Sequence, residues 1–297
     1  MSYSIKALLI VNLHAGKKIT KDEILKIKNS LEKKNCIVNV YCTKSKKDAT
    51  EAVLRLAHGF DVLICCGGDG TFHEVLNGIL KLNTQIPVAF IPFGTTNDLA
   101  KSLKLPLNIN DFVKKFSIER AAYQDVGFFN EKEYFSYVAS FGAFCEVAYS
   151  TPQKFKNFFG KIAYIFEGLR CVRKIKPYKV KIICDEEIIE ENFVFGAITN
   201  SCSVAGILEL KSEGIKFDDG KLELLLLKEP KNVLELIKML LDLRKNKFNG
   251  NLVILKHSKN IELELEAEVP FTLDGEYAGD FSCIKINCKE KAFKIIK

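Results

Sequence analysis

The chain has 297 residues, a hydrophobic content of 47%, a charged content of 27% and a formal net charge of +7 at pH 7. These values are typical of a soluble globular protein of about two domains. No apolar stretch approaches the roughly 18 residues of a membrane span. None of the ten cysteines forms a Cys-x-x-Cys pair, which excludes the usual zinc and thioredoxin-like motifs.

The first 125 residues alternate between strand-like and helix-like segments. Strands are expected at 6–11, 36–42, 61–66 and 87–91, and helices at 21–34, 48–57, 71–82 and from 97 onward. This alternation predicts a mostly parallel sheet covered by helices on both faces, a three-layer α/β domain. Ligands of such sheets bind beyond the carboxyl ends of the strands.

From residue 126 to 297 the pattern changes to a β-rich one. Strands are expected at 134–141, 179–184, 187–189, 193–199, 222–227, 252–256 and 261–265, and helices at 155–173 and 233–243. The second of these helices carries Glu235, Lys238 and Asp242, which argue against a membrane span. We therefore predict an α/β protein whose second domain is β-rich.

The stretch "CGGDGTFHEV" at 66–75 joins an expected strand to an expected helix. A strand end, a glycine turn and a helix N-terminus form a phosphate site, because backbone N–H groups are exposed there and no side chain blocks approach. A tight turn that binds nothing would show the same short pattern. On this motif alone the two interpretations are about equally weighted.

A second glycine turn, "PFGTTND" at 92–98, follows the next expected strand. Adjacent parallel strands bring their turns together, which favours a phosphate site over a simple Asn-capped hinge. Asp69 and Asp98 would then lie near bound phosphates. Carboxylates repel phosphate unless a cation stands between them, so the pair implies Mg²⁺ held partly through water.

A basic segment spans residues 151–181. It has one acid, Glu167, and nine basic residues: Lys154, Lys156, Lys161, Arg170, Arg173, Lys174, Lys176, Lys179 and Lys181. This excess indicates an anionic partner, either a membrane surface or a nucleic acid, although a solvated face is the simpler interpretation. No aromatic RNA-recognition motif is visible, so we do not expect nucleic acid.

The two glycine turns together resemble the catalytic domain of diacylglycerol kinases and the wider lipid kinase family. Further segments resemble that family in the same order: "VNLHAGK", "EVAYSTPQKFKNFFGKIAYIFEGL", "FDDGKLEL" and "LDGEY". The likeness covers essentially the whole chain and is greatest to the soluble bacterial diacylglycerol kinases. It implies a nucleotide-binding first domain, residues 1–125, and a lipid-binding second domain, residues 126–297.

The resemblance also implies site residues. It places ATP against Asn12, Leu13, His14, Ala15, Gly16, Lys17, Thr43, Gly67, Gly68, Asp69, Gly70, Thr71, Phe72, His73, Glu74, Gly94, Thr95 and Asn97. It implies an Asp-water-Mg²⁺ network of Asp69, Asp98 and Asp125, and a structural Mg²⁺ at Asp219 with the carbonyls of Lys216 and Lys221. The general base is expected to be Asp274, with Glu276 close by.

Two positions depart from the family pattern. Leu13 stands where the family usually has proline, which questions the rigidity of the first loop. His73 stands where the family often has asparagine. Its side chain would either reach a phosphate or the adenine side, or lie exposed on the helix.

The activity implied by the resemblance is ATP- and Mg²⁺-dependent phosphorylation of diacylglycerol to phosphatidic acid, in phospholipid metabolism. Other acceptors of the family are a sphingoid base, ceramide or monoacylglycerol. The remaining alternatives are an NAD kinase, which shares Gly-Gly-Asp-Gly-Thr, and a non-catalytic nucleotide-binding module. We expect a cytoplasmic protein in peripheral contact with anionic membrane, and the sequence allows a homodimer.

Overall fold

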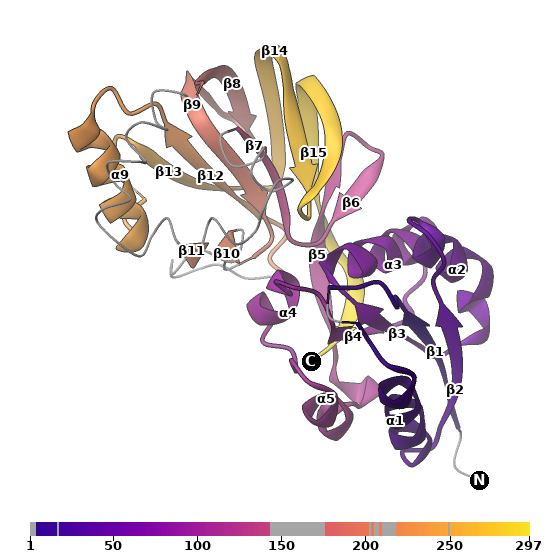
Figure 1. Cartoon of the computed structure of the whole chain (residues 1–297). Coiled ribbons are helices and arrows are strands. Elements are labelled where there is room, and N and C mark those ends of the chain that lie inside the picture. The colour runs from indigo at the N-terminus through magenta and orange to yellow at the C-terminus, as the bar shows by residue number, and fades with distance from the viewer. Residues whose placement is uncertain are drawn as a thin grey trace. The chain divides into compact units, whose positions relative to one another are not determined.

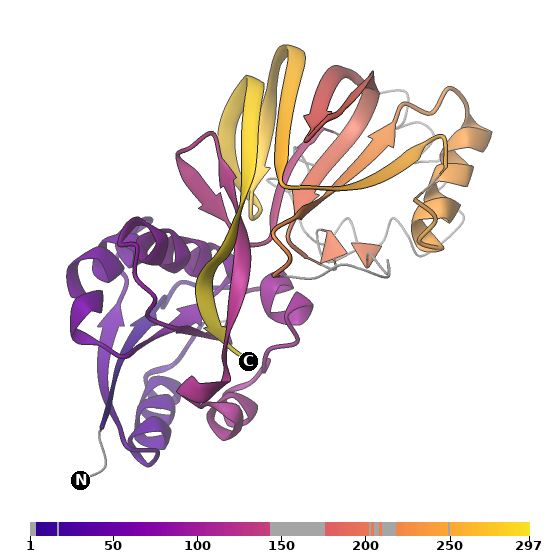
Figure 2. The same ribbon diagram turned by 180° about the vertical axis from the view of Figure 1, so that it is seen from behind.

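A computed structural model describes residues 4–16, 18–142, 176–201, 203–204, 208–209, 218–248 and 250–297 (Figures 1 and 2). These residues form two compact units. The first comprises the described residues of Met1–Val126 together with Asp218, Asp219 and Lys289–Lys297. The second comprises the described residues of Gly127–Lys216 and Gly220–Cys288. The last nine residues of the chain therefore belong to the N-terminal unit.

The first unit is built on four strands that pair in parallel in the order β4-β3-β1-β2. They are β1 (Ile5–Val11), β2 (Cys36–Cys42), β3 (Val62–Gly67) and β4 (Val88–Pro92). The end of β15 (Glu276–Ile296) lies beside β4, where Ile295 pairs in parallel with Val88. The C-terminus thus adds a further strand to this sheet.

Helices cover both faces of this sheet (Figure 1). They are α1 (Lys21–Glu32), α2 (Asp48–Leu56), α3 (Asp69–Lys81), α4 (Asp98–Ser102), α5 (Ile109–Lys115) and the short turns η1 (Ala57–Gly59) and η2 (Ile118–Arg120). Leu9 and Val11 pack with Ile27 of α1 and Phe112 of α5. Successive strand side chains point to opposite faces, so Leu8 and Ile10, both fully buried or nearly so, face the α2 and α3 side.

The second unit contains β6 (Glu133–Phe135), β7 (Val138–Gly142), β8 (Tyr178–Cys184), β9 (Glu187–Thr199), β10 (Ser203–Val204), β11 (Leu208–Glu209), β12 (Leu222–Lys228), β13 (Val253–Ser258), β14 (Asn260–Leu273) and helix α9 (Val233–Arg244). β5 (Ala121–Phe129) and β15 each run from one unit into the other. β9 and β14 are long strands, and each pairs antiparallel with β7 at one end and with β8 at the other.

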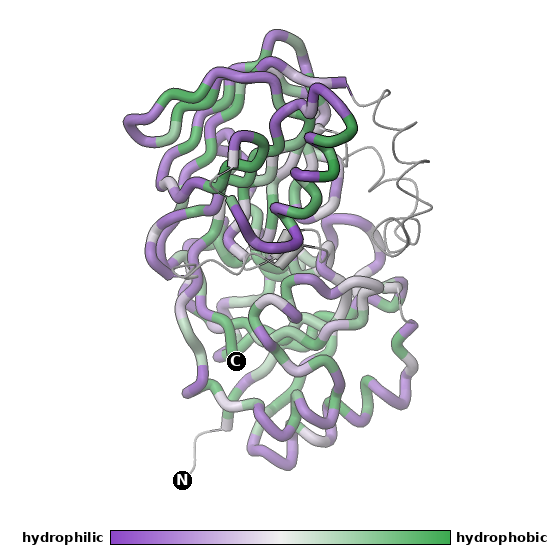
Figure 3. Tube along the Cα trace, turned by 90° about the vertical axis from the view of Figure 1, so that its left-hand side faces the viewer, coloured by the Kyte–Doolittle hydropathy of each residue, from purple (hydrophilic) through white to green (hydrophobic). Residues whose placement is uncertain are grey.

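The sheet of the second unit is buried on both faces along β12. Leu222, Leu224 and Leu226 join one hydrophobic cluster, whereas Leu225 and Leu227 join a second cluster with α9. This two-sided burial explains why residues 224–227 of β12 are four consecutive leucines rather than an alternating pattern. Figure 3 colours the chain by hydropathy and shows hydrophobic segments in the interior of each unit and hydrophilic ones at many of the turns.

The mixed α/β architecture is confirmed, and several boundaries are corrected. The expected strand 134–141 is two strands, β6 and β7, because residues 136 and 137 leave the strand conformation between Phe135 and Val138. The segments 187–189 and 193–199 form one strand, β9, and the long β15 was missed although Ile284, Ile286 and Cys288 alternate with polar residues.

Three parts of the sequence-based interpretation lie outside the described residues: Lys17, Lys216 and most of the basic segment with the expected helix 155–173. None of the helices in the described ranges is both long and apolar enough to cross a bilayer.

Close packing of α2 on α3 generates a first prediction. A Cβ added to Gly78 would lie 2.7 Å from Cβ of Val53. Gly→Ala in a helix normally stabilises by about 1 kcal/mol, but overpacking costs about 1–3 kcal/mol. We expect Gly78→Ala to lower the free energy of unfolding measured in urea, and to cost less in a Val53→Gly background, which removes the Val53 Cβ.

Gly59→Ala is the matched control, because an added Cβ there meets no atom within 4 Å. A Gly78→Ala variant as stable as the parent would contradict the packing argument.

Candidate nucleotide site

Three loops meet beyond the carboxyl ends of β1, β3 and β4. The two glycine turns touch through their backbones, since a Cβ on Gly94 would lie 2.8 Å from Cα of Gly68. A Cβ on Gly16 would overlap the hydroxyl of Thr95. The loop after β1 therefore packs against the turn after β4, and glycine is required at each contact because there is no room for a side chain.

Asn12 ties the first loop to the start of α3. Its backbone N–H donates to the Cys66 carbonyl (2.9 Å), and its side-chain Nδ2 donates to Thr71 Oγ1 (3.0 Å). Its Oδ1 accepts from the backbone N–H of His14 (2.9 Å). These bonds fix the loop without the family's proline, and Leu13 at that position is 37% exposed.

The N-terminus of α3 forms the floor of the site. Gly68 is its N-cap residue, has extended backbone and supplies no side chain that caps the helix. The dipole of a 13-residue helix and its first N–H groups favour a negative charge at this point. Thr43 lies nearby in the fold, because its N–H donates to the carbonyl of Val11 (2.9 Å) at the end of β1.

Asp69 connects the two glycine turns. Its carboxylate accepts from the backbone N–H of Asp98 (3.2 Å) and of Leu99 (3.4 Å), and from the hydroxyl of Thr96 (3.4 Å). Between them, Asn97 adopts a left-handed conformation (φ 51°) and donates through Nδ2 to the Gly94 carbonyl (3.0 Å). Asp69 and Asp98 are therefore neighbours, as the sequence predicts, and Asp69 also caps α4.

Asp274 has a different environment, in the second unit. It occupies the two-residue turn between β14 and β15 with φ 49°, followed by Gly275 with φ 87°. Its Oδ1 accepts from the N–H groups of Tyr137 (2.8 Å) and Val138 (3.0 Å). Its Oδ2 accepts from the N–H (3.0 Å) and the hydroxyl (3.2 Å) of Ser136. Both oxygens thus hold the chain where β6 ends and β7 begins.

Comparison with known proteins gives the family. Residues 6–128 match the family model described as the diacylglycerol kinase catalytic domain. A diacylglycerol kinase of Staphylococcus saprophyticus is 31% identical over 96% of this chain and 93% of its own length. One from Bacillus subtilis is 30% identical over 92% of this chain and 90% of its own. The chain belongs to the diacylglycerol kinase family.

Solved structures agree with this assignment. A crystal structure of a putative diacylglycerol kinase from Bacillus anthracis str. Sterne superposes with a TM-score of 0.80 at 27% identity, and covers 100% of this chain and 98% of that one. A second crystal structure from the same organism gives a TM-score of 0.77 at 25% identity. The chain is accordingly a kinase of the lipid kinase type, and ATP is the phosphoryl donor that this family implies.

Three residues that the kinase resemblance assigns to the nucleotide have other contacts. The ring of Phe72 is fully buried, with its centroid 4.9 Å from that of Phe90 and 6.2 Å from that of Phe293. The carboxylate of Glu74 accepts from the N–H groups of Lys47 (2.8 Å) and Ala49 (3.2 Å), so it caps α2. His73 is only 8% exposed, which rules out the alternative of an exposed helix residue.

The structure limits how these kinase residues can hold a metal. Within the described ranges, no three His, Cys, Asp or Glu side chains gather closely enough to bind an ion. Asp125 is 1% exposed and accepts through Oδ1 from the N–H of Lys291 (2.7 Å), which belongs to the returning C-terminal segment. Asp219 and Lys221 flank a turn at Gly220 (φ 76°), and Asp219 is exposed. The water-mediated network of Asp69, Asp98 and Asp125 stays a prediction.

The two cysteines before the first glycine turn are not nucleophiles. Burial raises the pKa of both thiols, that of Cys65 and that of Cys66, well above the usual range, and nearby acidic groups raise them further. They remain protonated and pack as small apolar residues.

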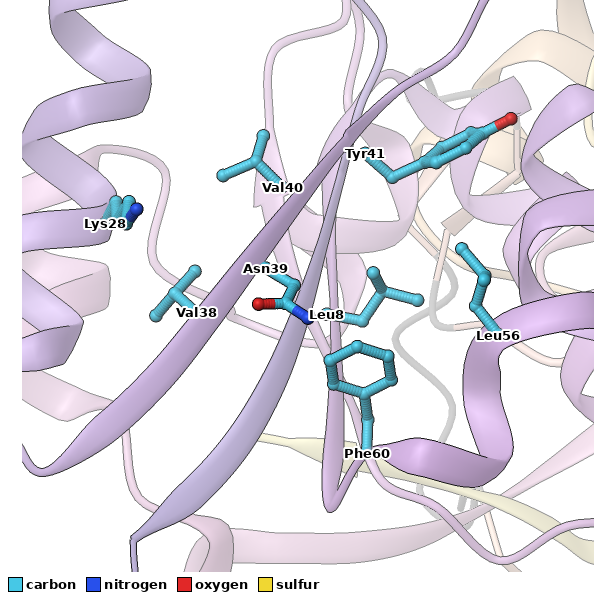
Figure 4. Close-up of a pocket in the computed structure, with 8 residues that line it drawn as sticks. All are labelled: Leu8, Lys28, Val38, Asn39, Val40, Tyr41, Leu56 and Phe60. Carbon is cyan, nitrogen blue, oxygen red and sulfur yellow. The ribbon is translucent and has the colours of Figure 1, made fainter.

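A separate groove lies along the edge strand β2 (Figure 4). It has a volume of about 460 Å³ and is lined by Leu8, Lys28, Val38, Asn39, Val40, Tyr41, Leu56 and Phe60. None of the residues assigned to ATP lines it, so it is not the nucleotide site of the kinase.

The backbone contact between the glycine turns generates a second prediction. Gly94→Ala places a Cβ 2.8 Å from Cα of Gly68 and 2.7 Å from Oδ1 of Asn97, and backbone cannot swing aside as a side chain can. We expect the turns to separate, with a loss of stability of about 1–3 kcal/mol and an ATP affinity at least about tenfold weaker, equivalent to about 1.4 kcal/mol. Calorimetric titration with ATP and urea denaturation measure the two effects.

Gly250→Ala is the control for Gly94→Ala, because its Cβ would meet only the carboxylate end of Asp242, at 3.3 Å. An ATP affinity within twofold of the parent in Gly94→Ala would show that the contact is not needed for binding.

Proposed function

We propose that the chain transfers the γ-phosphate of ATP to the free hydroxyl of diacylglycerol, giving phosphatidic acid and ADP for phospholipid metabolism. The observation that carries the proposal is the backbone contact of the two glycine turns, with Asp69 joined to the second turn. In the reaction the bond between the γ-phosphorus and its bridging oxygen breaks, the lipid oxygen bonds to phosphorus, and the hydroxyl proton passes to a carboxylate. Family membership supports the lipid class of the acceptor.

The first unit would hold the nucleotide through the loop at residues 12–17, the start of α3 and the turn at Gly94 and Thr95. Phosphoryl transfer depends mainly on positioning and on neutralising charge at the phosphates. Mg²⁺ bound to the nucleotide would spread the developing charge, with Asp69, Asp98 and Asp125 reaching it through water. A second Mg²⁺ at Asp219, with carbonyls of Lys216 and Lys221, would have a structural role.

The proton acceptor would come from the turn Leu273-Asp274-Gly275-Glu276. Hydrogen bonds that a carboxylate accepts favour its charged form and weaken it as a base. Asp274 accepts four, whereas Glu276 is exposed beside it at the start of β15. We therefore assign Asp274 to positioning the turn and Glu276 to accepting the proton.

The second unit would receive the lipid, and its basic segment would contact the membrane. Diacylglycerol is insoluble, so the enzyme must meet it at a bilayer. Lys154, Lys156 and Lys161, interleaved with phenylalanines, lie outside the described residues, and the support for this role is their sequence alone. Basic residues near an anionic surface contribute about 1 kcal/mol each, which favours weak and reversible binding.

The proposed reaction is tested with γ-labelled ATP and a panel of acceptors. Diacylglycerol, monoacylglycerol, ceramide and a sphingoid base are offered separately, with NAD as the acceptor outside the lipid class. We expect label in phosphatidic acid, identified by product mass. Label in another phospholipid would reassign the acceptor, and label only in NADP, or in no product, would contradict a lipid kinase.

A further prediction separates the two carboxylates of the turn. Glu276→Gln is expected to lower turnover about 10²–10⁴-fold, the usual contribution of a positioned base, with unchanged melting temperature. Asp274→Asn turns an amide N–H₂ toward the donors of Ser136, Tyr137 and Val138, and each unsatisfied donor costs about 1–3 kcal/mol. We expect it to lower the melting temperature and turnover together.

Ser136→Ala is the graded control for Asp274→Asn, because it removes one of the four hydrogen bonds and should lower stability by only about 0.5–1.5 kcal/mol. The assignment fails if Glu276→Gln retains turnover while Asp274→Asn melts like the parent and is inactive. In that case Asp274 is the base.

A further inference from the structure

Helix α9 presents an outward face made of Leu234, Lys238, Leu241 and Lys245. These positions are spaced by four, three and four residues, so they lie on one side of the helix. Leu234 is 78% exposed and Leu241 is 47% exposed, and both lysines are exposed. We call this set the α9 outer face.

The opposite side of α9 holds the helix firmly on the second unit. Leu236, Met239 and Leu243 are buried in the hydrophobic cluster that includes β12. Asn232 caps the first turn by accepting from the N–H of Glu235 (2.9 Å). The two exposed leucines therefore belong to a well-anchored helix and are not the result of a frayed end.

The charged residues around the α9 outer face are mostly basic. Residues 231–247 include five basic residues, Lys231, Lys238, Arg244, Lys245 and Lys247, and two acids, Glu235 and Asp242. At 100° per residue, Asp242 and Glu235 lie about 80° and 100° around the helix from Leu234, on its flank. The carboxylate of Glu235 accepts from the backbone N–H of Lys231 (2.8 Å), which turns it toward the helix start.

We propose that the α9 outer face is a membrane-docking surface for anionic phospholipid bilayers. A short helix with leucines and lysines on one side lies in the plane of the interface, with the leucines entering the acyl boundary and the lysines meeting lipid phosphates. A 12-residue helix is about 18 Å long, too short to cross the hydrocarbon core. The lack of acids on this face matches the negative charge of the bilayer and disfavours a basic partner.

A groove beside the face offers room for a headgroup. Its volume is about 740 Å³, and Lys238, Lys247 and His257 are among its lining residues, with Asp242 as the opposing charge. Lys238 thus belongs both to the outer face and to the groove. The groove extends the basic surface from the exposed side of the helix toward β13, which lies beside α9 in Figure 1.

The test is co-sedimentation of the full chain with phosphatidylglycerol vesicles, compared with phosphatidylcholine vesicles. Leu234→Gln combined with Leu241→Gln removes the apolar contacts without loss of helix propensity, since glutamine forms helices about as well as leucine. We expect binding to phosphatidylglycerol to weaken at least about tenfold, because two leucine side chains no longer leave water for the acyl boundary. Lys238→Gln with Lys245→Gln should weaken it less, and only at low salt.

Ile188→Thr is the matched control, because Ile188 is 65% exposed on β9 of the same unit. It should leave vesicle binding unchanged, and all variants should melt like the parent. Unchanged vesicle binding in the double leucine variant would overturn the proposal.

The docking proposal rests on the proposed lipid kinase activity, because that activity requires the enzyme to reach a bilayer. The vesicle assay measures binding and needs no turnover. If docking fails while phosphatidic acid is still made, only the α9 surface is wrong. If docking holds while no lipid is labelled, only the proposed reaction is wrong.

Discussion

The architecture of the nucleotide site depends on one steric constraint, the contact between the backbones of Gly68 and Gly94. Neighbouring parallel strands lie about 4.8 Å apart, so turns that leave β3 and β4 side by side cannot both carry side chains on the facing side. Removing the side chains exposes backbone N–H groups and the start of α3. Asp69 then spans the gap and caps α4. The same steric constraint thus leaves backbone N–H groups open at the start of α3, where an anion is expected to bind, and places the Asp69 carboxylate beside them.

The first unit includes a segment from far along the chain, residues 289–297. Phe293 packs near Phe72 under α3, Ile295 pairs with Val88, and the N–H of Lys291 bonds to the buried carboxylate of Asp125. These contacts join residues more than 160 positions apart. Such long-range pairings carry a large loop-closure cost before they gain any packing energy, which slows folding. The position of Asp125, and with it the expected water-mediated network, therefore depends on the C-terminal strand.

The sequence predicted those features whose signal is local. Alternating strands and helices, both glycine turns, and the proximity of Asp69 to Asp98 follow from periodicity and from the geometry of parallel sheets. The strand break at Ser136, the capping of α2 by Glu74 and the return of β15 could not be predicted, because each depends on partners distant in sequence or on a neighbouring helix. Sequence pattern shows that a carboxylate is present but not whether its oxygens are already engaged. The family resemblance implied an ATP contact for Glu74 and the general base for Asp274, and both roles stay predictions; the hydrogen bonds of the two carboxylates are what the structure adds.

The turn after β14 shows why two adjacent carboxylates can have different roles. Asp274 has φ 49°, a left-handed conformation that aspartate tolerates better than most residues, and this directs its side chain to the donors at 136–138. Four accepted hydrogen bonds join it to residues 136–138 and fix the turn, which is the basis for proposing Asp274 as the anchor. Glu276 begins β15 on the other side of Gly275, with its side chain exposed, and its position is set by the turn that Asp274 holds. Pairs of carboxylates in unlike environments commonly divide positioning and proton transfer in this way. If Glu276 accepts the proton, as proposed, loss of the Asp274 anchor would lower turnover by displacing Glu276. Inactivity of an Asp274 variant then does not by itself identify the proton acceptor, and stability must be measured with it.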